Sequence, residues 1–336
     1  MMSDPEPTVT DLLSRPDWRA QVPGGLRDLI ELRVGVPFRL EIVPGGLVHL
    51  VARAGGPKGS LILKQRLSHC VGLPTIAIRP EEIKAEARAL TLVGAIAPAL
   101  FPRGLDFFNR LNLLVETDEA TNRQTLPSWL SSREDEAVVV IFQTLAGVVA
   151  GIHAATATSG ISVREDGDTA FLARNLYERI GFLGTDWSGI VAALAGRPRQ
   201  LTLGDLSPKN ILIGESADLC IVDLEHVHRG PAILDLAFLL AHAFLTLAPR
   251  STRVRLTSLA TINAGYAAIS PILPPDDELL GPSVLALLRY RLESPVVPYD
   301  FGLPPTVVCD LDAALQGLSP HTDLATVWAT ATAALG

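Results

Sequence analysis

Three polar residues in the second half of the sequence have the types and spacing that phosphoryl transfer requires. Asp205 and Asn210 stand five residues apart, and Asp223 follows a short β-rich run. Carboxylate and amide oxygens can hold a divalent metal ion, and a carboxylate can orient a hydroxyl group toward a nucleotide phosphate. A turn rich in Asp and Asn is the structural alternative. The joint spacing favours the catalytic interpretation.

The expected roles of these residues differ. We expect Asp205 to orient a substrate hydroxyl and accept its proton late in the transfer. Asn210 and Asp223 are expected to hold one or two Mg²⁺ ions, and Glu225, two residues after Asp223, is a further candidate ligand.

A lysine and a glutamate in the first part of the chain could complete such a site. Lys64, one of only four lysines, ends an apolar strand-like run, where a charge is costly unless it is paired. Glu86 lies in the next predicted helix, and such a strand lysine paired with a helix glutamate holds ATP phosphates in kinases. A lysine extending its amine to solvent from a strand end is the alternative, which the later residues disfavour.

Two further segments are candidates for nucleotide contacts. Gly45 and Gly46 stand between two predicted strands, where glycines let backbone amides approach phosphates, although a simple hairpin turn is an equal alternative. The backbone of Glu116 and Thr117, at the end of another strand, would hold the adenine of ATP.

Other polar residues in apolar surroundings are expected to support the fold. His153 and His242 are expected to be packed structural histidines. Asp235, within an apolar run, needs hydrogen-bond donors, and we expect backbone amides of the 203–210 loop to supply them. Arg289 and Arg291 could face the substrate, and a solvated helix end is the equal alternative.

Apolar periodicity predicts the elements that must position these residues. The first part reads as an antiparallel sheet with one helix inserted after the third strand. Its predicted helices span residues 24–34 and 80–93, and its predicted strands span 38–43, 47–52, 60–64 and 111–116. An α+β class follows.

The rest of the chain reads as mostly helical. The predicted helices span residues 137–155, 232–248, 252–269, 276–290, 307–317 and 322–335, and a short hairpin spans 210–213 and 218–222. We predict a nucleotide-binding lobe with a preceding helix over residues 1–117. A helical lobe over 118–336 would carry the catalytic loop and the substrate site.

Composition excludes several classes of function. The chain has 336 residues and a formal charge of −8, which disfavours nucleic-acid binding. The three cysteines are far apart and form no metal-binding or redox pair, which indicates a reducing compartment. The acidic N-terminus resembles no signal peptide, and the apolar run 232–248 is too short and too polar to span a membrane. A cytoplasmic monomer or homodimer without a membrane partner is expected.

Together these residues resemble the aminoglycoside phosphotransferase and choline kinase superfamily, whose fold is similar to that of protein kinases. The family pattern His-Gly-Asp-x₄-Asn, Asp-x-Glu and Gly-Pro-x₃-Asp-Leu-Ala is matched by residues 203–210, 223–225 and 230–237, except that Leu203 replaces the histidine. Residues 63–90 and 223–231 are also partly similar to methylthioribose kinases. The resemblance implies a two-lobed fold with ATP between the lobes, Mg²⁺ as cofactor and a small-molecule hydroxyl as acceptor.

The acceptor and the activity leave alternatives open. A small sugar or polyol is one acceptor, and an aminoglycoside-like antibiotic is another, because the acidic residues 276–278 would suit a cation. Leu203 cannot donate a hydrogen bond as the family histidine does, so the position of Asp223 would rest on other contacts. A non-catalytic nucleotide-binding pseudokinase is therefore the alternative function.

Overall fold

The computed structural model describes residues 8–14, 25–44, 46–160, 162–164, 167–274, 276–293 and 302–336. The chain forms two compact units. Met1–Arg123 and Cys220–Glu225 make up the first, and Gln124–Leu219 and His226–Gly336 make up the second. An antiparallel sheet dominates the first unit and helices dominate the second, which confirms the predicted α+β class.

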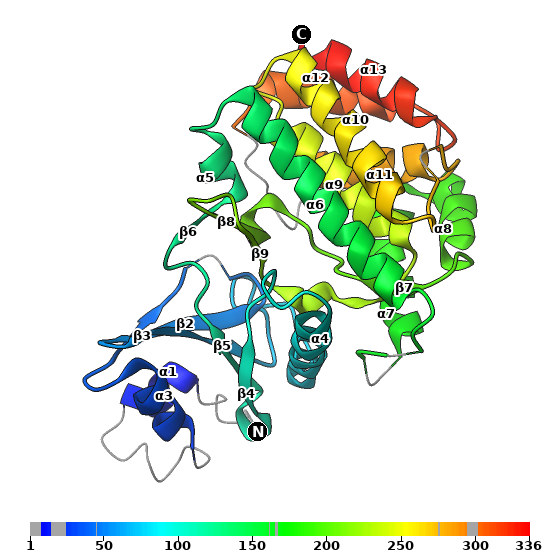
Figure 1. Ribbon diagram of the computed structural model, residues 1–336. Helices are drawn as coiled ribbons and strands as arrows, with labels where there is room; N and C mark the ends of the chain where they lie inside the picture. Colours follow the sequence, from blue (N-terminus) through cyan, green and yellow to red (C-terminus); the bar gives the residue numbers. More distant parts are fainter. Residues whose placement is uncertain are drawn as a thin grey trace. The chain divides into compact units, whose positions relative to one another are not determined.

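Five antiparallel strands form the sheet of the first unit, in the order β1-β2-β3-β5-β4 (Figure 1). They are β1 (Arg39–Ile42), β2 (His49–Gly56), β3 (Gly59–Arg66), β4 (Gly104–Phe108) and β5 (Leu113–Thr117). Side chains alternate between the faces of a strand. Leu61 and Leu63 of β3 therefore point to one face of the sheet, and Lys64 and Arg66 point to the other.

Two helices cover the apolar face of this sheet. Helices α1 (Val9–Ser14) and α3 (Leu26–Val34) share a buried core with it, and α3 contributes the i, i+4, i+8 series Leu26, Ile30 and Val34. The other face is left to polar side chains and to α4.

Helix α4 (Ile83–Ile96) follows a 3₁₀ turn, η1 (Pro80–Glu82), as the sequence predicts for residues 80–93. Proline at the start suits the helix because its missing N–H has no partner there in any case. Glu86 lies on the buried stripe of α4 with Ile83 and Leu90, so the helix presents a carboxylate inward.

Helices make up most of the second unit. They are α5 (Leu126–Leu130), α6 (Asp135–Thr156), α7 (Asp168–Arg179), α8 (Ser188–Ala195), α9 (Ala232–Thr246), α10 (Thr252–Ile269), α11 (Leu280–Glu293), α12 (Pro305–Gln316) and α13 (Leu324–Leu335). Helix α9 is buried nearly throughout and packs on α6, α10 and α11, as predicted for the apolar run 232–248.

The remaining elements of the two units are short strands and 3₁₀ turns. The strands are β6 (Arg123–Thr125), β7 (Gln200–Thr202), β8 (Ile211–Gly214), β9 (Leu219–Ile221) and β10 (His228–Gly230), and the turns are η2 (Asn109–Leu111), η3 (Gly181–Leu183), η4 (Thr185–Trp187), η5 (Pro208–Asn210) and η6 (Leu224–His226). Strand β7 pairs with β10, and β8 and β9 form the predicted hairpin.

The structure corrects several predicted boundaries. The strand predicted over residues 47–52 continues through Gly55 and Gly56, and the turn that follows it lies at Pro57 and Lys58. The strand predicted to start at residue 111 starts at Leu113, because Asn112 adopts a left-handed conformation with φ 46° after η2. Strands β4, β6, β7 and β10 and helices α1, α5, α7 and α8 have no counterpart in the sequence prediction.

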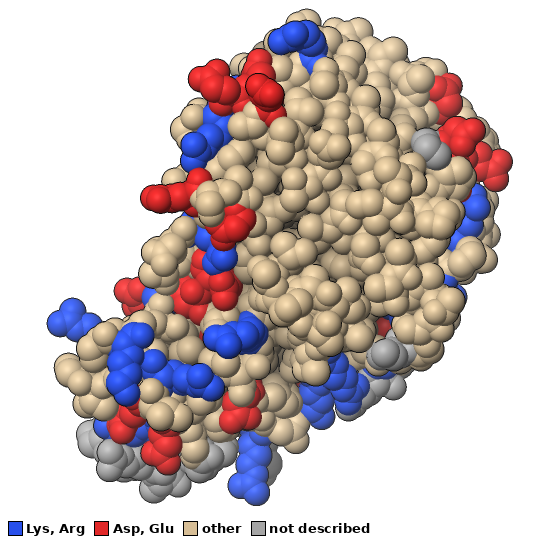
Figure 2. All heavy atoms as spheres, viewed as in Figure 1, with Lys and Arg blue, Asp and Glu red and all other residues tan. Residues whose placement is uncertain are grey.

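Among the described helices, only α6 has the length and apolar composition to cross a membrane. Half of its apolar window is buried inside the structure, and α6 packs on α9, α10 and β7. Figure 2 shows a broad area over α6 and α10 with few Lys, Arg, Asp or Glu side chains. We assign α6 as a core helix, since core helices meet the same criteria.

Candidate active site

Lys64 is the centre of a buried charge cluster in the first unit. Its side chain is 7% exposed, and Nζ lies 2.7 Å from Glu86 Oε1, 3.2 Å from Asp223 Oδ1 and 3.7 Å from Glu116 Oε1. Burial alone would lower the pKa of Lys64, but the three carboxylates hold it well above its usual value. The structure thus brings together the lysine, the helix glutamate and the aspartate that the sequence singles out.

Glu86 joins this lysine to the segment that carries Asp223. Glu86 Oε1 accepts hydrogen bonds from Lys64 Nζ and, at 3.1 Å, from the backbone N–H of Leu224. Burial raises the pKa of Glu86, and its Oε2 atom has no hydrogen-bond partner among the described residues.

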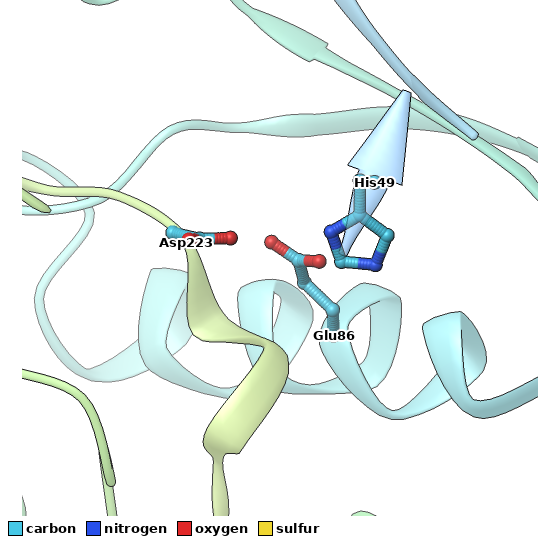
Figure 3. Close-up of side chains that lie close together, drawn as sticks. All are labelled: His49, Glu86 and Asp223. Carbon is cyan, nitrogen blue, oxygen red and sulfur yellow. The ribbon is translucent and has the colours of Figure 1, made fainter. Parts of the chain in front are cut away.

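The Glu86 carboxylate also belongs to a group of side chains that could hold a cation. Glu86, Asp223 and His49 each bring one potential ligand atom within 4.8 Å of the others, and Figure 3 shows the Glu86 carboxylate between the other two side chains. Carboxylate oxygens are the donors that Mg²⁺ prefers. Burial lowers the pKa of His49 to about 3, so its ring is neutral.

The end of β5 places its two candidate residues differently. The Glu116 side chain is buried near Lys64, and burial raises the pKa of Glu116 to about 7. Thr117 is fixed by Arg103, whose backbone N–H donates to Thr117 Oγ1 at 2.9 Å and whose carbonyl accepts from the Thr117 N–H at 3.1 Å.

The glycine turn is described only in part. Gly45 lies outside the described residues. At Gly46 an added Cβ would lie 2.7 Å from the carbonyl oxygen of His49, so a side chain there would require a backbone shift. A close backbone approach of this kind is a reason for glycine at this turn.

Asp223 and Glu225 each face a cation from β3. Asp223 has a φ of 67°, uncommon for a residue other than glycine, and Lys64 binds its side chain. Glu225 lies 3.4 Å from Arg66 Nη1 and 3.7 Å from His49 Nδ1. Burial, followed by repulsion from Asp223, raises the pKa of Glu225 well above its usual value.

In the second unit the loop after β7 folds Asn210 back onto Asp205. Asn210 Nδ2 donates to Asp205 Oδ2 at 3.2 Å and to the Asp205 carbonyl at 3.3 Å, and Asp205 Oδ1 accepts from the Ser207 N–H at 3.2 Å. Pro208 begins the 3₁₀ turn that contains Asn210. The five-residue spacing therefore closes into one carboxylate–carboxamide pair.

Asp235 holds the start of this loop, as the sequence predicts. Its carboxylate is fully buried and accepts from the backbone N–H groups of Leu203 at 2.6 Å and Gly204 at 2.8 Å. His153 Nε2 lies 3.0 Å from the same carboxylate, and its Nδ1 lies 2.6 Å from the Tyr266 hydroxyl. His153 is therefore structural, and the leucine at position 203 is held through its amide.

Gly204→Ala should destabilise the protein by about 1–3 kcal/mol. Gly204 has a φ of 78°, and an added Cβ would clash with the His226 carbonyl oxygen. Urea unfolding followed by circular dichroism measures the effect. Gly189→Ala is the matched control: Gly189 lies inside α8 with open space around it. Equal unfolding midpoints for the two variants would contradict the expected strain.

The structure places the two candidate substrate arginines of α11 differently. Arg291 Nη2 lies 3.9 Å from Asp205 Oδ1, and its Nε donates to His242 Nε2 at 2.8 Å. Burial lowers the pKa of His242 well below its usual value, which leaves a neutral ring that can accept this bond. Arg289 pairs instead with Glu293, one turn along the helix, at 2.6 Å.

Two buried arginines that contact candidate site residues, Arg66 and Arg179, are not identified from the sequence. Arg179 donates to the carbonyl oxygen of Gly204, and burial lowers its pKa. It lies in α7, which the sequence does not predict. The sequence does contain a signal for Arg66. It lies two residues after Lys64 on the same strand face, and Glu82 lies one helical turn before Glu86, so a second pair beside Lys64–Glu86 could have been predicted.

The acidic residues 276–278, considered for a cationic acceptor, have structural contacts. Asp277 Oδ1 accepts from Arg197 at 3.0 Å and from the Leu279 N–H at 2.9 Å, just before α11. Glu278 is exposed and lies 3.9 Å from the same arginine.

Comparison with known proteins gives one family. Residues 40–272 match the family described as "Phosphotransferase enzyme family". No curated protein matches the chain.

Similar solved structures are distant in sequence. A choline/ethanolamine kinase family protein from Mesorhizobium loti is 16% identical, with a TM-score of 0.50, and the match covers 92% of this chain and 98% of that one. Choline kinase LicA from Streptococcus pneumoniae is 14% identical with the same two coverages and a TM-score of 0.48. Macrolide 2′-phosphotransferase MphH from Brachybacterium faecium is 22% identical over 72% of this chain and 84% of that one, with a TM-score of 0.43.

Proposed function

This chain belongs to the phosphotransferase enzyme family, and from that premise we propose that it transfers the γ-phosphate of ATP to a hydroxyl group of a small sugar or polyol. The observation that carries the proposal is the Lys64 amine, which binds both Glu86 and Asp223. A lysine held in this way is oriented to bind phosphate oxygens.

The first unit supplies the nucleotide and metal contacts in this proposal. Lys64, braced by Glu86, would bind the phosphates of ATP, with backbone groups near Gly46 and Thr117 as further contacts. Asp223 would be the metal ligand of the first unit, and Asn210 is the candidate metal ligand of the second. Bound Mg²⁺ supplies positive charge that offsets the charge developing on the phosphate oxygens.

The second unit supplies the acceptor contacts. Asp205 would orient the acceptor hydroxyl and take its proton late in the transfer. Asn210 holds the Asp205 carboxylate from one side, and Ser207 holds it through a backbone N–H. This fixed geometry would reduce the entropic cost of bringing the hydroxyl into line with the phosphate.

The charge beside Asp205 favours a neutral or anionic acceptor over a polycationic one. Arg291 approaches the Asp205 carboxylate, so a positive group already stands next to the proposed base. The acidic residue Asp277 is bound by Arg197 and a backbone amide. We therefore place a sugar or polyol ahead of an aminoglycoside.

The non-catalytic alternative rested on Leu203. The Leu203 backbone N–H donates to Asp235, and Lys64 of β3 binds Asp223. The loop at Leu203 and the segment at Asp223 are therefore each held by contacts that need no histidine. Together with family membership, these contacts favour the enzyme.

A panel assay tests the proposal. Purified protein with ATP and Mg²⁺ should consume ATP only with a hydroxyl acceptor, and the panel should contain sugars, polyols, choline, ethanolamine, aminoglycosides and a macrolide. We expect phosphorylation of a sugar or polyol, lost when EDTA removes the metal. ATP binding without phosphorylation of any panel member would support the non-catalytic alternative, and an aminoglycoside product would overturn the acceptor assignment.

A further inference from the structure

A second ion pair runs parallel to the Lys64–Glu86 pair. Arg66 follows Lys64 by two residues on β3, so both side chains leave the same face of the strand. Glu82 precedes Glu86 by four residues, one helical turn. Arg66 Nη2 lies 2.8 Å from Glu82 Oε2, and Lys64 Nζ lies 2.7 Å from Glu86 Oε1.

Each of these cations also binds one carboxylate of the Asp-x-Glu segment. Lys64 Nζ lies 3.2 Å from Asp223 Oδ1, and Arg66 Nη1 lies 3.4 Å from Glu225 Oε2. The residue between the two carboxylates donates its backbone N–H to Glu86. Residues two apart on β3 therefore bind residues two apart in this segment.

The guanidinium of Arg66 is fixed in orientation. Its Nε donates to the carbonyl oxygen of Arg79 at 2.9 Å, its Nη2 to Glu82, and its Nη1 faces Glu225 and, at 3.4 Å, His49 Nε2. A guanidinium only donates hydrogen bonds. The imidazole nitrogen that it contacts must therefore accept.

Asp223 and Glu225 differ in their access to a metal ion. The Asp223 side chain is 25% exposed and belongs to the cluster with Glu86 and His49, whereas the Glu225 side chain is 11% exposed and lies outside that cluster. Both carboxylates stand beside a cation, so proximity alone does not separate them. The Arg66 guanidinium is also held by the Arg79 carbonyl and Glu82 and cannot move away from the more buried Glu225, where it would repel a divalent cation, whereas the more exposed Asp223 can be reached beside the flexible Lys64 amine.

We propose that Arg66 is a positioning residue that holds the Glu225 carboxyl group, so that Asp223 alone in this segment binds the metal. The inference rests on the proposed kinase function and revises the sequence expectation that Glu225 is a further ligand. Arg66 supplies a fixed positive charge at the place where Glu225 would otherwise recruit a cation.

Metal binding, rather than turnover, gives the most direct test. Mn²⁺ is titrated into the full-length protein with a non-hydrolysable ATP analogue, and free Mn²⁺ is read by electron paramagnetic resonance. Glu225→Gln should leave the Mn²⁺ affinity within about twofold of wild type, whereas Asp223→Asn should lower it roughly tenfold or more. Glu81→Gln, which changes an exposed neighbour of Glu82, is the control.

A rescue experiment separates positioning from general stability. Arg66→Met removes the guanidinium from Glu225 and should tighten Mn²⁺ binding or add a second bound ion while lowering kcat. Adding Glu225→Gln should return Mn²⁺ binding to the wild-type level and recover part of kcat. The double variant removes the charge at both positions and keeps the test usable if Arg66→Met alone does not fold.

The outcomes distinguish the two proposals. If Glu225→Gln weakens Mn²⁺ binding as much as Asp223→Asn while the wild type phosphorylates an acceptor, Glu225 is a ligand and only this inference fails. If the wild type binds no Mn²⁺ with the nucleotide analogue, the proposed function fails with it.

Discussion

Asp205→Ala is expected to lower kcat by about 10²–10⁴-fold, the usual contribution of a positioned general base. Nucleotide affinity should stay close to wild type, because the proposed phosphate contact, Lys64, belongs to the other unit. The loss would fall on kcat, since the variant removes the group that orients the hydroxyl during transfer. Steady-state kinetics on the acceptor identified by the panel, with calorimetric titration of the nucleotide, measures both quantities.

A conservative variant and a control variant separate the loss of the Asp205 charge from other effects. Asp205→Asn keeps an oxygen that can accept from the Ser207 N–H but removes the charge, so it should also lose most activity if the carboxylate acts as a base. Glu215→Gln changes an exposed carboxylate in the β8–β9 turn of the same unit and should turn over at the wild-type rate. Wild-type turnover by Asp205→Ala would remove Asp205 from the proposed mechanism.

Local patterns in the sequence predict the residues that lie close together along the chain. Asp205 and Asn210 meet because a five-residue loop containing proline can close on itself. Lys64 and Glu86 meet because a strand followed by a helix packs the helix on one face of the sheet, and the strand period of two selects that face. These features need no knowledge of distant segments.

Contacts between distant segments are harder to predict. Arg291 reaches Asp205 from a helix more than eighty residues later, and Arg179 reaches the same loop from α7. Helices α7 and α8 lie in a region of mixed polarity with short elements, where periodicity gives a weak signal. The left-handed backbone at Asn112 and Asp223 likewise comes from packing and turn geometry that a hydrophobic pattern does not contain.

Residue 203 shows how a departure from a sequence pattern can be compensated. A family histidine at this position would offer its side chain as a donor, and Leu203 cannot. The structure anchors the loop through the backbone, with the Leu203 and Gly204 amides bound to Asp235. Because a backbone N–H is present whatever the side chain, the sequence departure removes less support than the pattern suggests.

Asp235→Ala should therefore have the largest effect on stability, a loss of about 3–5 kcal/mol. The substitution leaves two buried amides without an acceptor and removes the carboxylate that faces His153. Urea unfolding followed by circular dichroism measures the loss. Because total stability is usually only about 5–15 kcal/mol, the variant should be measured at low temperature.

The pattern of activity shows whether this anchor also positions Asp205. Asp235→Asn keeps the side-chain volume and one oxygen that can accept a backbone N–H. Its NH₂ group cannot accept the second N–H, so this variant should lose some stability, but less than Asp235→Ala. Asp310→Ala, which removes an exposed acid from α12, should be close to neutral. If the folded fraction of Asp235→Ala keeps the wild-type kcat, Asp235 stabilises the fold without setting the position of Asp205. A lower kcat at an unchanged KM for ATP would show that the loop bound by Asp235 sets the geometry of Asp205, the proposed base.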